Sequence, residues 1–380
     1  MNLLHRYIFK EIVAATAMAV GLFVFVLVLG NVMREVLDRL ASGQIDLPMF
    51  GYLLVNYIPG VIPYALPLGL LTAVLLVVGR MCAQREFTAM RAAGLSLWSL
   101  AAPIMLVACL GTLLCLFINI DYAPAADHAV KVALANLVRQ DPSRLFIPGS
   151  YVREFKGYII RSGGREGPKL LDIWIWKVDD QGRAVARVHG SRGHLDYNSA
   201  SDVLTLILED GAEESYNPTD PDYLASVKNA GPQFKGGGYP LNMGDLIPFS
   251  AGFTKLSLLT VDELLRRRDE KPPNLANPKP AETAVWRMEV QMQIQRDFAG
   301  AFSVLALALL GLPLSLRVGR AENFVNLALA LGLALIYYFL LFSINLLHKH
   351  PELRPDLLLW APNFIFEALG IWLLYRAAKR

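Results

Sequence analysis

Residues that could carry out chemistry are few in this sequence, and none of them forms a known catalytic pattern. The chain has no G-x-x-x-x-G-K-[S/T] segment, the glycine-rich loop that cradles nucleotide phosphates. It also has no H-E-x-x-H zinc motif, no G-x-S-x-G nucleophile turn and no paired-cysteine motif. We therefore expect no catalytic residue, no metal site and no cofactor of its own in this chain.

Three scattered ionisable residues are the remaining candidates. His348 and His350 stand in one short polar loop, where solvated histidines are commoner than metal ligands. Glu367 lies within an apolar segment, where a carboxylate marks a transport path, a pair with a neighbouring helix or a polar seam. Because the other apolar segments carry few charges near their centres, the sequence argues against a proton- or sodium-coupled carrier.

The most informative polar segment is Met81–Ser96, MCAQREFTAMRAAGLS, which separates two long apolar runs. It is too polar to cross a bilayer, yet Phe87, Met90 and Leu97 recur at helical spacing. Gly94 is a suitable residue to end such a helix. We predict a short amphipathic helix near residues 82–94, on the cytoplasmic side. Its periodicity leaves two roles open: an interfacial anchor for the loop, or a docking surface for a cytoplasmic partner.

The elements that position these residues are apolar runs long enough to cross a membrane. A hydrocarbon core of about 30 Å needs about 20 apolar residues in a helix, and the composition, 54% hydrophobic and 18% charged, suits a bilayer. Six such runs lie near residues 12–32, 52–78, 97–120, 298–316, 325–347 and 357–375. The second run contains Pro59, Pro63 and Pro67, so we expect its first half to be kinked or broken.

Lysine and arginine in the short flanks of these runs predict the orientation. With the N-terminus inside, ten of them lie on the cytoplasmic side: Arg6, Lys10, Arg80, Arg85, Arg91, Arg317, Arg320, Arg376, Lys379 and Arg380. Four lie outside: Arg34, Arg39, Lys349 and Arg354. We therefore predict that both termini are cytoplasmic and that the polar segment between the third and fourth runs lies outside the cytoplasm.

That polar segment, residues 122–296, reads as a β domain. Alternating or β-branched runs predict strands near 151–155, 158–161, 172–178, 184–189, 193–197 and 203–208. Turn signals such as Gly163-Gly164 separate them, and Gly236-Gly237-Gly238 predicts a loop tip. Short antiparallel strands at this spacing favour a sandwich or jelly roll. The three cysteines, Cys82, Cys109 and Cys115, lie outside the segment, which therefore contains no disulfide.

Helical pieces flank the predicted strands, at 127–138, in VDELLRRRDE after Thr260, and at 282–297 before the fourth run. The predicted fold is therefore membrane α-helical, with six transmembrane helices and an inserted all-β, jelly-roll-like domain. Its predicted parts are 1–121 with the first three spans, 122–296 with the β domain, and 297–380 with the last three spans.

Several motifs resemble those of one known family. They are RYIFKE at the start, PLGLL followed by REFTAMRAAGLS, GLPLSLRVGR after the fourth span, and LWAPNFIF in the sixth. In this order, and with the β-rich insertion, the sequence resembles the LptF/LptG (YjgP/YjgQ) permeases of the lipopolysaccharide-exporting ABC transporter. The resemblance covers essentially the whole chain, and the ALPLGLL and AMRAAGLS segments look slightly closer to LptF than to LptG.

The resemblance implies a function and a set of partners. It implies an inner-membrane permease subunit that extracts lipopolysaccharide and passes it to a periplasmic bridge protein. It further implies a heterodimer with a paralogous permease, a cytoplasmic ATPase dimer that binds the ATP, and a single-span periplasmic jelly-roll protein as neighbours. The chain itself is then not an enzyme, which agrees with its lack of a phosphate-binding loop.

The resemblance also assigns residues. Glu86 matches the acidic position of the family's coupling helix, and Arg91 and Gly94 match neighbouring positions of the motif. Arg34 and Arg39 stand at the outer end of the first span, where basic residues of the family contact the phosphates of lipopolysaccharide. An interfacial anchor whose long side chain reaches the headgroups remains the alternative role for Arg34.

Two other functions compete with transport. One is a non-transporting inner-membrane scaffold whose outer β domain links envelope proteins. The other, an intramembrane enzyme, is disfavoured because no catalytic group of residues lies at membrane depth. No block of like charges suggests nucleic acid. A transport subunit should co-purify with an ATPase, whereas a scaffold should not.

Overall fold

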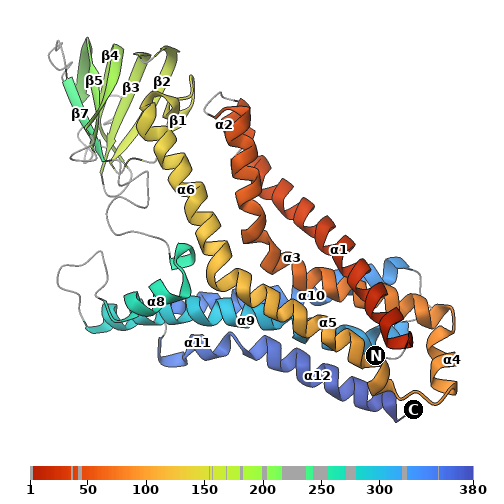
Figure 1. The fold of residues 1–380 in the computed structure, drawn as a ribbon. Helices are drawn as coiled ribbons and strands as arrows, with labels where there is room; N and C mark the ends of the chain where they lie inside the picture. The colour runs from red at the N-terminus through yellow and green to blue at the C-terminus, as the bar shows by residue number, and fades with distance from the viewer. Residues whose placement is uncertain are drawn as a thin grey trace. The chain divides into compact units, whose positions relative to one another are not determined.

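The computed structural model describes residues 3–35, 37–41, 45–153, 155, 157–167, 169–179, 183–198, 203–215, 237–242, 256–270, 280–318, 323–349 and 351–379. The chain divides into two compact units, shown in Figure 1. The membrane unit comprises Met1–Arg34, Leu53–His128 and Leu256–Arg380. The β unit comprises Glu35–Tyr52 and Ala129–Lys255.

Long helices dominate the membrane unit. They are α1 (Leu3–Glu35), α3 (Leu47–Ala83), α5 (Leu97–Phe117), α9 (Pro280–Val318), α10 (Asn323–Asn345) and α12 (Ala361–Ala378). The described residues contain six spans long and apolar enough to cross a membrane: Leu3–Gly30, Leu47–Ala83, Leu97–Leu134, Glu282–Leu316, Val325–His348 and Pro355–Ala378. The prediction of six membrane helices around an inserted β domain is confirmed.

Shorter elements connect these helices. A π-helical turn, η1 (Ile118–Tyr122), joins α5 to α6 (Ala123–Gln140), so the helix of the third span continues past the apolar run, as predicted. The helix expected after Thr260 is α8 (Val261–Arg268), which begins with a capping box between Thr260 and Glu263. Short α11 (Pro355–Leu358) precedes α12. The proline-rich segment 271–279 lies outside the described residues.

The prolines of α3 do not break it. Pro59, Pro63 and Pro67 all lie inside one continuous helix, which bends along its length in Figure 1. The expected kink is therefore compatible with the structure, but the expected break is absent. Most of the second half of α3, from Ala65 to Met81, is buried inside the unit, and these neighbouring helices support the helix beyond its prolines.

Helix α9 packs against both α5 and α12. Small side chains such as Ala301 and Ala308 line its buried face and permit close approach of neighbouring backbones. Two hydrogen bonds connect three helices: Tyr337 of α10 donates to Asn363 of α12 at 2.8 Å, and the Asn363 amide donates to the Ala299 carbonyl of α9 at 2.8 Å. These bonds fix the mutual register of the three helices.

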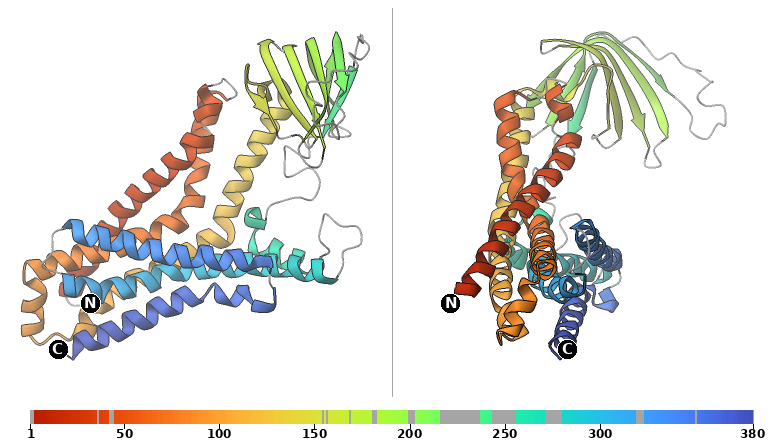
Figure 2. Two further views of the ribbon diagram at one scale, coloured as in Figure 1. Left: turned by 180° about the vertical axis from the view of Figure 1, so that it is seen from behind. Right: turned by 90° about the vertical axis from the view of Figure 1, so that its right-hand side faces the viewer.

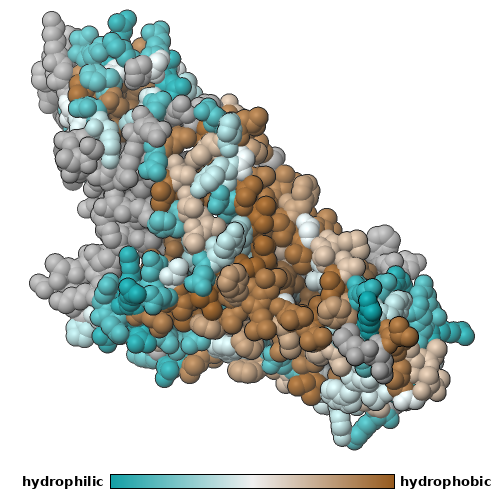
Figure 3. Space-filling model, in the orientation of Figure 1, coloured by the Kyte–Doolittle hydropathy of each residue, from teal (hydrophilic) through white to brown (hydrophobic). Residues whose placement is uncertain are grey.

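The outer surfaces of the spans are hydrophobic. Exposed apolar side chains gather on α1 and α10, among them Leu22, Phe25, Leu335 and Phe339. Figure 3 shows hydrophobic side chains over the middle of the visible helices and hydrophilic ones towards their ends. In water such a surface would be unfavourable, so these faces must meet lipid or another apolar helix.

Gly370 marks the closest approach of α12 to α9. A Cβ atom there would lie 2.8 Å from the backbone carbon and oxygen of Leu309. We expect Gly370→Ala to force the helices apart and to cost about 1–3 kcal/mol, the usual range for overpacking. Gly332→Ala on α10 is the matched control, because a Cβ there meets nothing within 4 Å. The melting temperature of the purified protein should fall for Gly370→Ala and stay unchanged for Gly332→Ala. Equal melting temperatures of the two variants would contradict the close packing.

The described part of the β unit contains one antiparallel sheet of seven strands in the order β1-β2-β3-β4-β5-β7, with β6 paired to β4. The strands are β1 (Tyr151–Val152), β2 (Tyr158–Glu166), β3 (Lys169–Val178), β4 (Ala184–Asn198), β5 (Val203–Leu208), β6 (Gly211–Ser215) and β7 (Gly237–Asn242). The sheet is strongly curved (Figure 2). Its inner face holds the hydrophobic core, including Ile160, Ile173, Ile175, Val188 and Leu206.

Glycines misled the strand prediction in two places, and a third difference lies in β4. The strands predicted at 184–189 and 193–197 form a single β4, which runs through Gly190, where a Cβ would lie 3.0 Å from the Leu208 side chain. Gly163 lies inside β2, where a Cβ would lie 2.6 Å from the Asp172 carboxylate. Gly237 and Gly238 open β7, so the predicted loop tip is wrong there, whereas Gly236 lies outside the described residues. These glycines mark close approach rather than turns.

One strained residue organises the outer face of the sheet. Asp172 has φ of 47°, rare for a residue with a side chain. One oxygen of its carboxylate lies 2.9 Å from His189 Nε2 and accepts from the Trp174 ring at 3.0 Å. The hydrogen bond with His189, followed by that with Trp174, holds the pKa of Asp172 below its ordinary value. The ionised Asp172 carboxylate therefore stabilises the fold at neutral pH, and this stabilisation is lost as the pH falls through the lowered pKa.

Candidate functional site

The segment between the second and third spans folds as α4 (Glu86–Ala92). It begins after Arg85, whose φ is 62°, and ends before Gly94, whose φ is 87°. Two left-handed residues therefore set the helix off from α3 and α5, and glycine adopts that conformation at no steric cost. Cys82 and Ala83 belong to α3, so the short helix starts later than the predicted residue 82.

Helix α4 has two different faces. Phe87 and Met90 are 7% and 8% exposed and belong to the same buried cluster as Ile8 of α1 and Leu374 of α12. On the opposite side, Thr88, Ala89 and Arg91 are exposed. The apolar face thus attaches α4 to the ends of several spans, and the polar face is left for solvent or another protein.

Polar contacts reinforce this attachment. The Tyr7 hydroxyl donates to a Glu86 carboxylate oxygen at 3.4 Å, a long bond between α1 and α4. Arg80 at the end of α3 forms an ion pair with Glu11 of α1. His5 lies 3.0 Å from the Ser99 hydroxyl of α5. These bonds join α1 to α4, α3 and α5 at this end of the membrane unit.

Arg91 and Gly94 complete the end of α4. The Gly94 amide donates to the Arg91 carbonyl at 3.0 Å and closes the last turn. A Cβ on Gly94 would meet nothing within 4 Å, so its positive φ, not crowding, is the reason for glycine there. The Arg91 side chain projects from the last turn, where a cation is favoured by the helix dipole.

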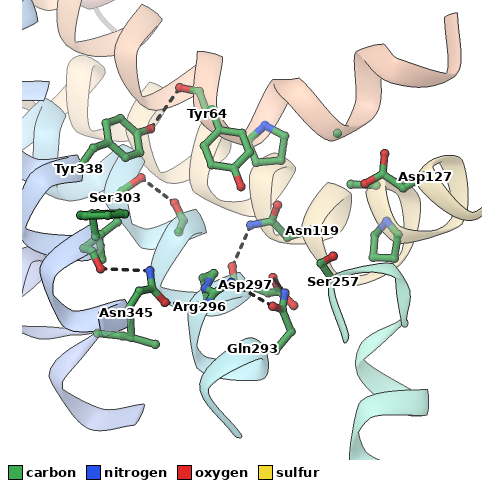
Figure 4. A pocket seen from close by; sticks show the side chains of 18 of the residues that line it. Tyr64, Asn119, Asp127, Ser257, Gln293, Arg296, Asp297, Ser303, Tyr338 and Asn345 are labelled. Atoms are coloured by element: carbon green, nitrogen blue, oxygen red, sulfur yellow. Dashed lines mark hydrogen bonds between the residues drawn. The ribbon is translucent and has the colours of Figure 1, made fainter. Parts of the chain in front are cut away.

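A second site lies at the other end of α5, within the membrane unit. It is a cavity of about 350 Å³, here called the polar pocket, enclosed by α3, η1, the start of α6, α9 and α10. Figure 4 shows polar side chains from several of these elements pointing towards one another. The π-helical turn η1 carries Asn119, whose amide donates to the Asp297 carbonyl of α9 at 2.8 Å. Such wide turns recur at functional sites.

Gln293 bridges two charged neighbours on α9. Its amide nitrogen donates to an Asp297 carboxylate oxygen at 3.0 Å, and its amide oxygen accepts from Arg296 at 3.2 Å. Arg296 also donates to the side-chain oxygen of Asn345 on α10. Across the pocket, the Tyr338 hydroxyl donates to the Tyr64 carbonyl of α3 at 3.3 Å. The wall of the pocket therefore places the Arg296 guanidinium beside the Asp297 carboxyl group, and the side-chain amides of Gln293 and Asn345 hold them there.

Comparison with known proteins identifies the family. A family model described as lipopolysaccharide export system permease LptF/LptG matches residues 6–376. The chain belongs to this family. A search of curated proteins finds no match. As a member of the LptF/LptG family the chain is a multi-pass inner-membrane permease subunit of lipopolysaccharide export, and not itself an enzyme. The family model covers LptF and LptG together, so the resemblance to LptF stays a prediction.

The residues that the LptF/LptG resemblance assigned to substrate lie at the end of α1 and in the short helix after it. The backbone of Arg34 lies in the last turn of α1, and that of Arg39 in α2 (Leu37–Ala41). Their side chains are outside the described part of the structure. Their roles, like those of Glu86, Arg91 and Gly94, stay predictions.

Glu367 and the polar pocket complete the comparison with the sequence. Glu367 lies partly buried on α12 and makes no ion pair with any residue that the structure describes. The polar pocket was not predicted, because its residues come from segments nearly 300 positions apart. A sequence signal does exist: Asn119, Gln293, Arg296, Asp297 and Asn345 all stand near the same ends of their predicted spans.

Proposed function

We propose that this chain is one half of the lipopolysaccharide export permease and that it works with an ATPase on another chain. It takes lipopolysaccharide from the inner membrane, pairs with a paralogous permease subunit, and passes the lipid to periplasmic proteins. The observation that carries this proposal is the family match over residues 6–376. The lack of a phosphate-binding loop in the sequence supports placing ATP on a partner.

Helix α4 is the proposed docking element for the ATPase dimer. Its apolar face is buried in its own chain, which leaves a short polar face with Glu86 at the first turn. A short helix of this kind can lie in a groove of a partner protein. Because Phe87 and Met90 of α4 share a buried cluster with Ile8 of α1, ATPase movement at α4 would be transmitted to the helix whose last turn holds Arg34.

The β unit is the proposed contact with the periplasmic bridge. Among the described strands, β1 and β7 stand at the two ends of the sheet path. An open strand edge can pair with a strand of another protein. A jelly-roll neighbour would thereby extend the sheet and offer the lipid a continuous route.

Reconstitution tests the proposal directly. The chain is co-expressed with its paralogous permease and purified into nanodiscs, and associated proteins are identified. We expect an ATPase to co-purify and its ATP hydrolysis to rise when lipopolysaccharide is added. Stable association with periplasmic proteins alone, without an ATPase, would favour the non-transporting scaffold and overturn the proposal.

The proposed orientation places both termini and α4 in the cytoplasm and the β unit in the periplasm. The N- and C-termini lie at the α4 end of the membrane unit in Figures 1 and 2, as six spans require. With Cys82, Cys109 and Cys115 replaced, we expect Ser201→Cys to react with an impermeant maleimide on intact spheroplasts. The control Thr88→Cys on α4 should react only after permeabilisation. The reverse pattern would contradict the orientation.

A further inference from the structure

The polar pocket has the size and position of a site for a lipid headgroup. Its volume of about 350 Å³ falls within the range of small-ligand sites. It lies beyond Phe117, the last residue of α5, whereas α4 lies before the first residue, Leu97. The pocket is therefore near the ends of the spans remote from α4, where headgroups meet a membrane protein. Tyr64 is 55% exposed and Arg296 is also exposed, so the cavity opens to the surface.

The charges of the pocket suit a zwitterion better than a simple anion. It is lined by one guanidinium, Arg296, and two carboxylates, Asp127 and Asp297. The lining therefore offers groups that can carry either sign, which suits a ligand with both charges better than a lone phosphate. A group that carries both a phosphate and an ammonium would place each opposite a charge of the other sign.

Arg296 and Asp297 keep bonding capacity for such a group. Arg296 has five N–H donors, and the described residues accept from it at Gln293 and Asn345. The Asp297 carboxylate accepts from Gln293 through one oxygen. The glutamine amide thus holds the two charges as neighbours, and no ion pair between them occurs among the described residues. A phosphate can accept from the guanidinium while an ammonium donates to the carboxylate.

The carboxylates and the apolar groups of the pocket indicate a primary amine attached to a lipid. The rings of Tyr64 and Tyr338 lie 6.4 Å apart, and any ammonium is attracted to such ring faces. Only a primary ammonium also has N–H groups to donate to the Asp297 and Asp127 carboxylates. Gly60 leaves room for Asp127, whose carboxylate oxygen would lie 3.1 Å from a Cβ there. Leu341 and Phe342 line the same cavity, and they suit the first carbons of acyl chains rather than a free, fully hydrated headgroup.

We propose that the polar pocket binds a membrane phospholipid with a zwitterionic, primary-amine headgroup of the phosphoethanolamine type. The phosphate contacts Arg296, and the ammonium lies between Asp297 and Asp127. This assignment needs only the membrane location of the helices. It does not depend on the coupling of the chain to an ATPase.

Lipid retention tests the assignment. The full complex is reconstituted in nanodiscs that contain equal amounts of phosphatidylethanolamine, phosphatidylglycerol and phosphatidylcholine. A photoactivatable phosphatidylethanolamine is crosslinked, and the modified peptides are identified by mass spectrometry. We expect crosslinks in residues 119–127 and 293–303, and at least about tenfold less crosslinking with the phosphatidylglycerol and phosphatidylcholine probes, the effect of losing a charged contact.

Matched variants separate the site from general damage. Arg296→Gln and Asp297→Asn should each lower crosslinking about tenfold, and Arg296→Lys should retain part of it. Arg266→Gln, at an exposed arginine of α8 whose ion pair with Asp262 is also exposed, is the control outside the pocket and should change nothing. Folding is checked by size-exclusion profile, and ATP hydrolysis is recorded in parallel.

Three results would overturn the proposal. One is equal crosslinking of the three lipid probes. Another is unchanged crosslinking in Arg296→Lys, Arg296→Gln and Asp297→Asn. The third is complete displacement by soluble phosphoethanolamine at low concentration, which would assign the pocket to a free headgroup instead of a lipid. Loss of ATP hydrolysis with retained lipid selectivity would contradict only the transport function.

Discussion

Replacing Glu86 by lysine is expected to uncouple the chain from its ATPase while leaving the membrane unit folded. Among the residues that the structure describes, Glu86 accepts one long hydrogen bond, from Tyr7 at 3.4 Å, and it has a favourable position in the first turn of α4. Loss of a carboxylate there costs only about 0.3–1 kcal/mol of helix stability. Phe87 and Met90, which attach α4 to the core, are not altered.

The large effect of the substitution is expected on binding of the ATPase. Reversal of a close charge pair at an interface can cost several kcal/mol, because attraction becomes repulsion. We therefore expect Glu86→Lys to reduce ATPase co-purification and lipopolysaccharide-stimulated hydrolysis by at least about 10-fold. Glu86→Gln should fall between the wild type and Glu86→Lys, since it removes the charge without adding repulsion.

Two controls distinguish docking from damage within the chain. Tyr7→Phe removes only the hydrogen bond to Glu86 and should retain activity. Thr88→Lys adds a positive charge on the exposed face of α4 but keeps the carboxylate. If Glu86→Lys assembles and exports lipid normally, α4 does not couple the ATPase stroke through this residue.

How well the sequence predicted the structure depended on how local each signal was. The spans follow from the length of apolar runs, and α4 from the spacing of Phe87 and Met90, because both signals lie within one element. The turn predicted at Gly163 and the loop tip predicted at Gly237 were wrong because both glycines look like turn residues. Only the neighbouring strand shows that a Cβ at Gly163 would lie 2.6 Å from the Asp172 carboxylate.

The polar pocket could not be predicted by the same reasoning. Arg296 and Asp297 read as part of a polar helix leading into the fourth span, and Asn119 as the end of the third. The hydrogen bond from Asn119 to α9 depends on the π-helical turn η1 and on helix packing, which sequence periodicity does not report. Sites assembled from distant segments need the tertiary structure.

Replacing Arg34 by glutamate is expected to remove lipopolysaccharide binding at the end of α1. Arg34 lies in the last turn of a 33-residue helix whose residues from Ile12 to Met33 are almost all apolar. In the proposed orientation this end is at the outer leaflet, where an anionic lipid headgroup would lie. A guanidinium there can donate two parallel hydrogen bonds to a phosphate, and the bilayer edge would leave it less screened by salt than an open surface charge.

The size of the effect should follow the charge at this position. Arg34→Ala removes the contact, and Arg34→Glu adds repulsion, so we expect crosslinking to lipopolysaccharide to fall at least about tenfold in the latter. Arg34→Lys keeps the charge but not the bidentate geometry and should retain part of the binding. Arg39→Glu in α2 is the nearest matched control, with a smaller expected loss because Arg39 belongs to a separate helix.

Photo-crosslinking in the reconstituted complex, normalised to folded protein, measures this binding. An interfacial anchor would give a different pattern: lysine, alanine and glutamate would then change the amount of folded protein, and crosslinking per folded molecule would stay constant. Unchanged crosslinking and unchanged lipid-stimulated ATP hydrolysis in Arg34→Glu would therefore assign Arg34 to anchoring. A graded loss from lysine through alanine to glutamate, at constant folded yield, requires a direct contact between this side chain and an anionic substrate.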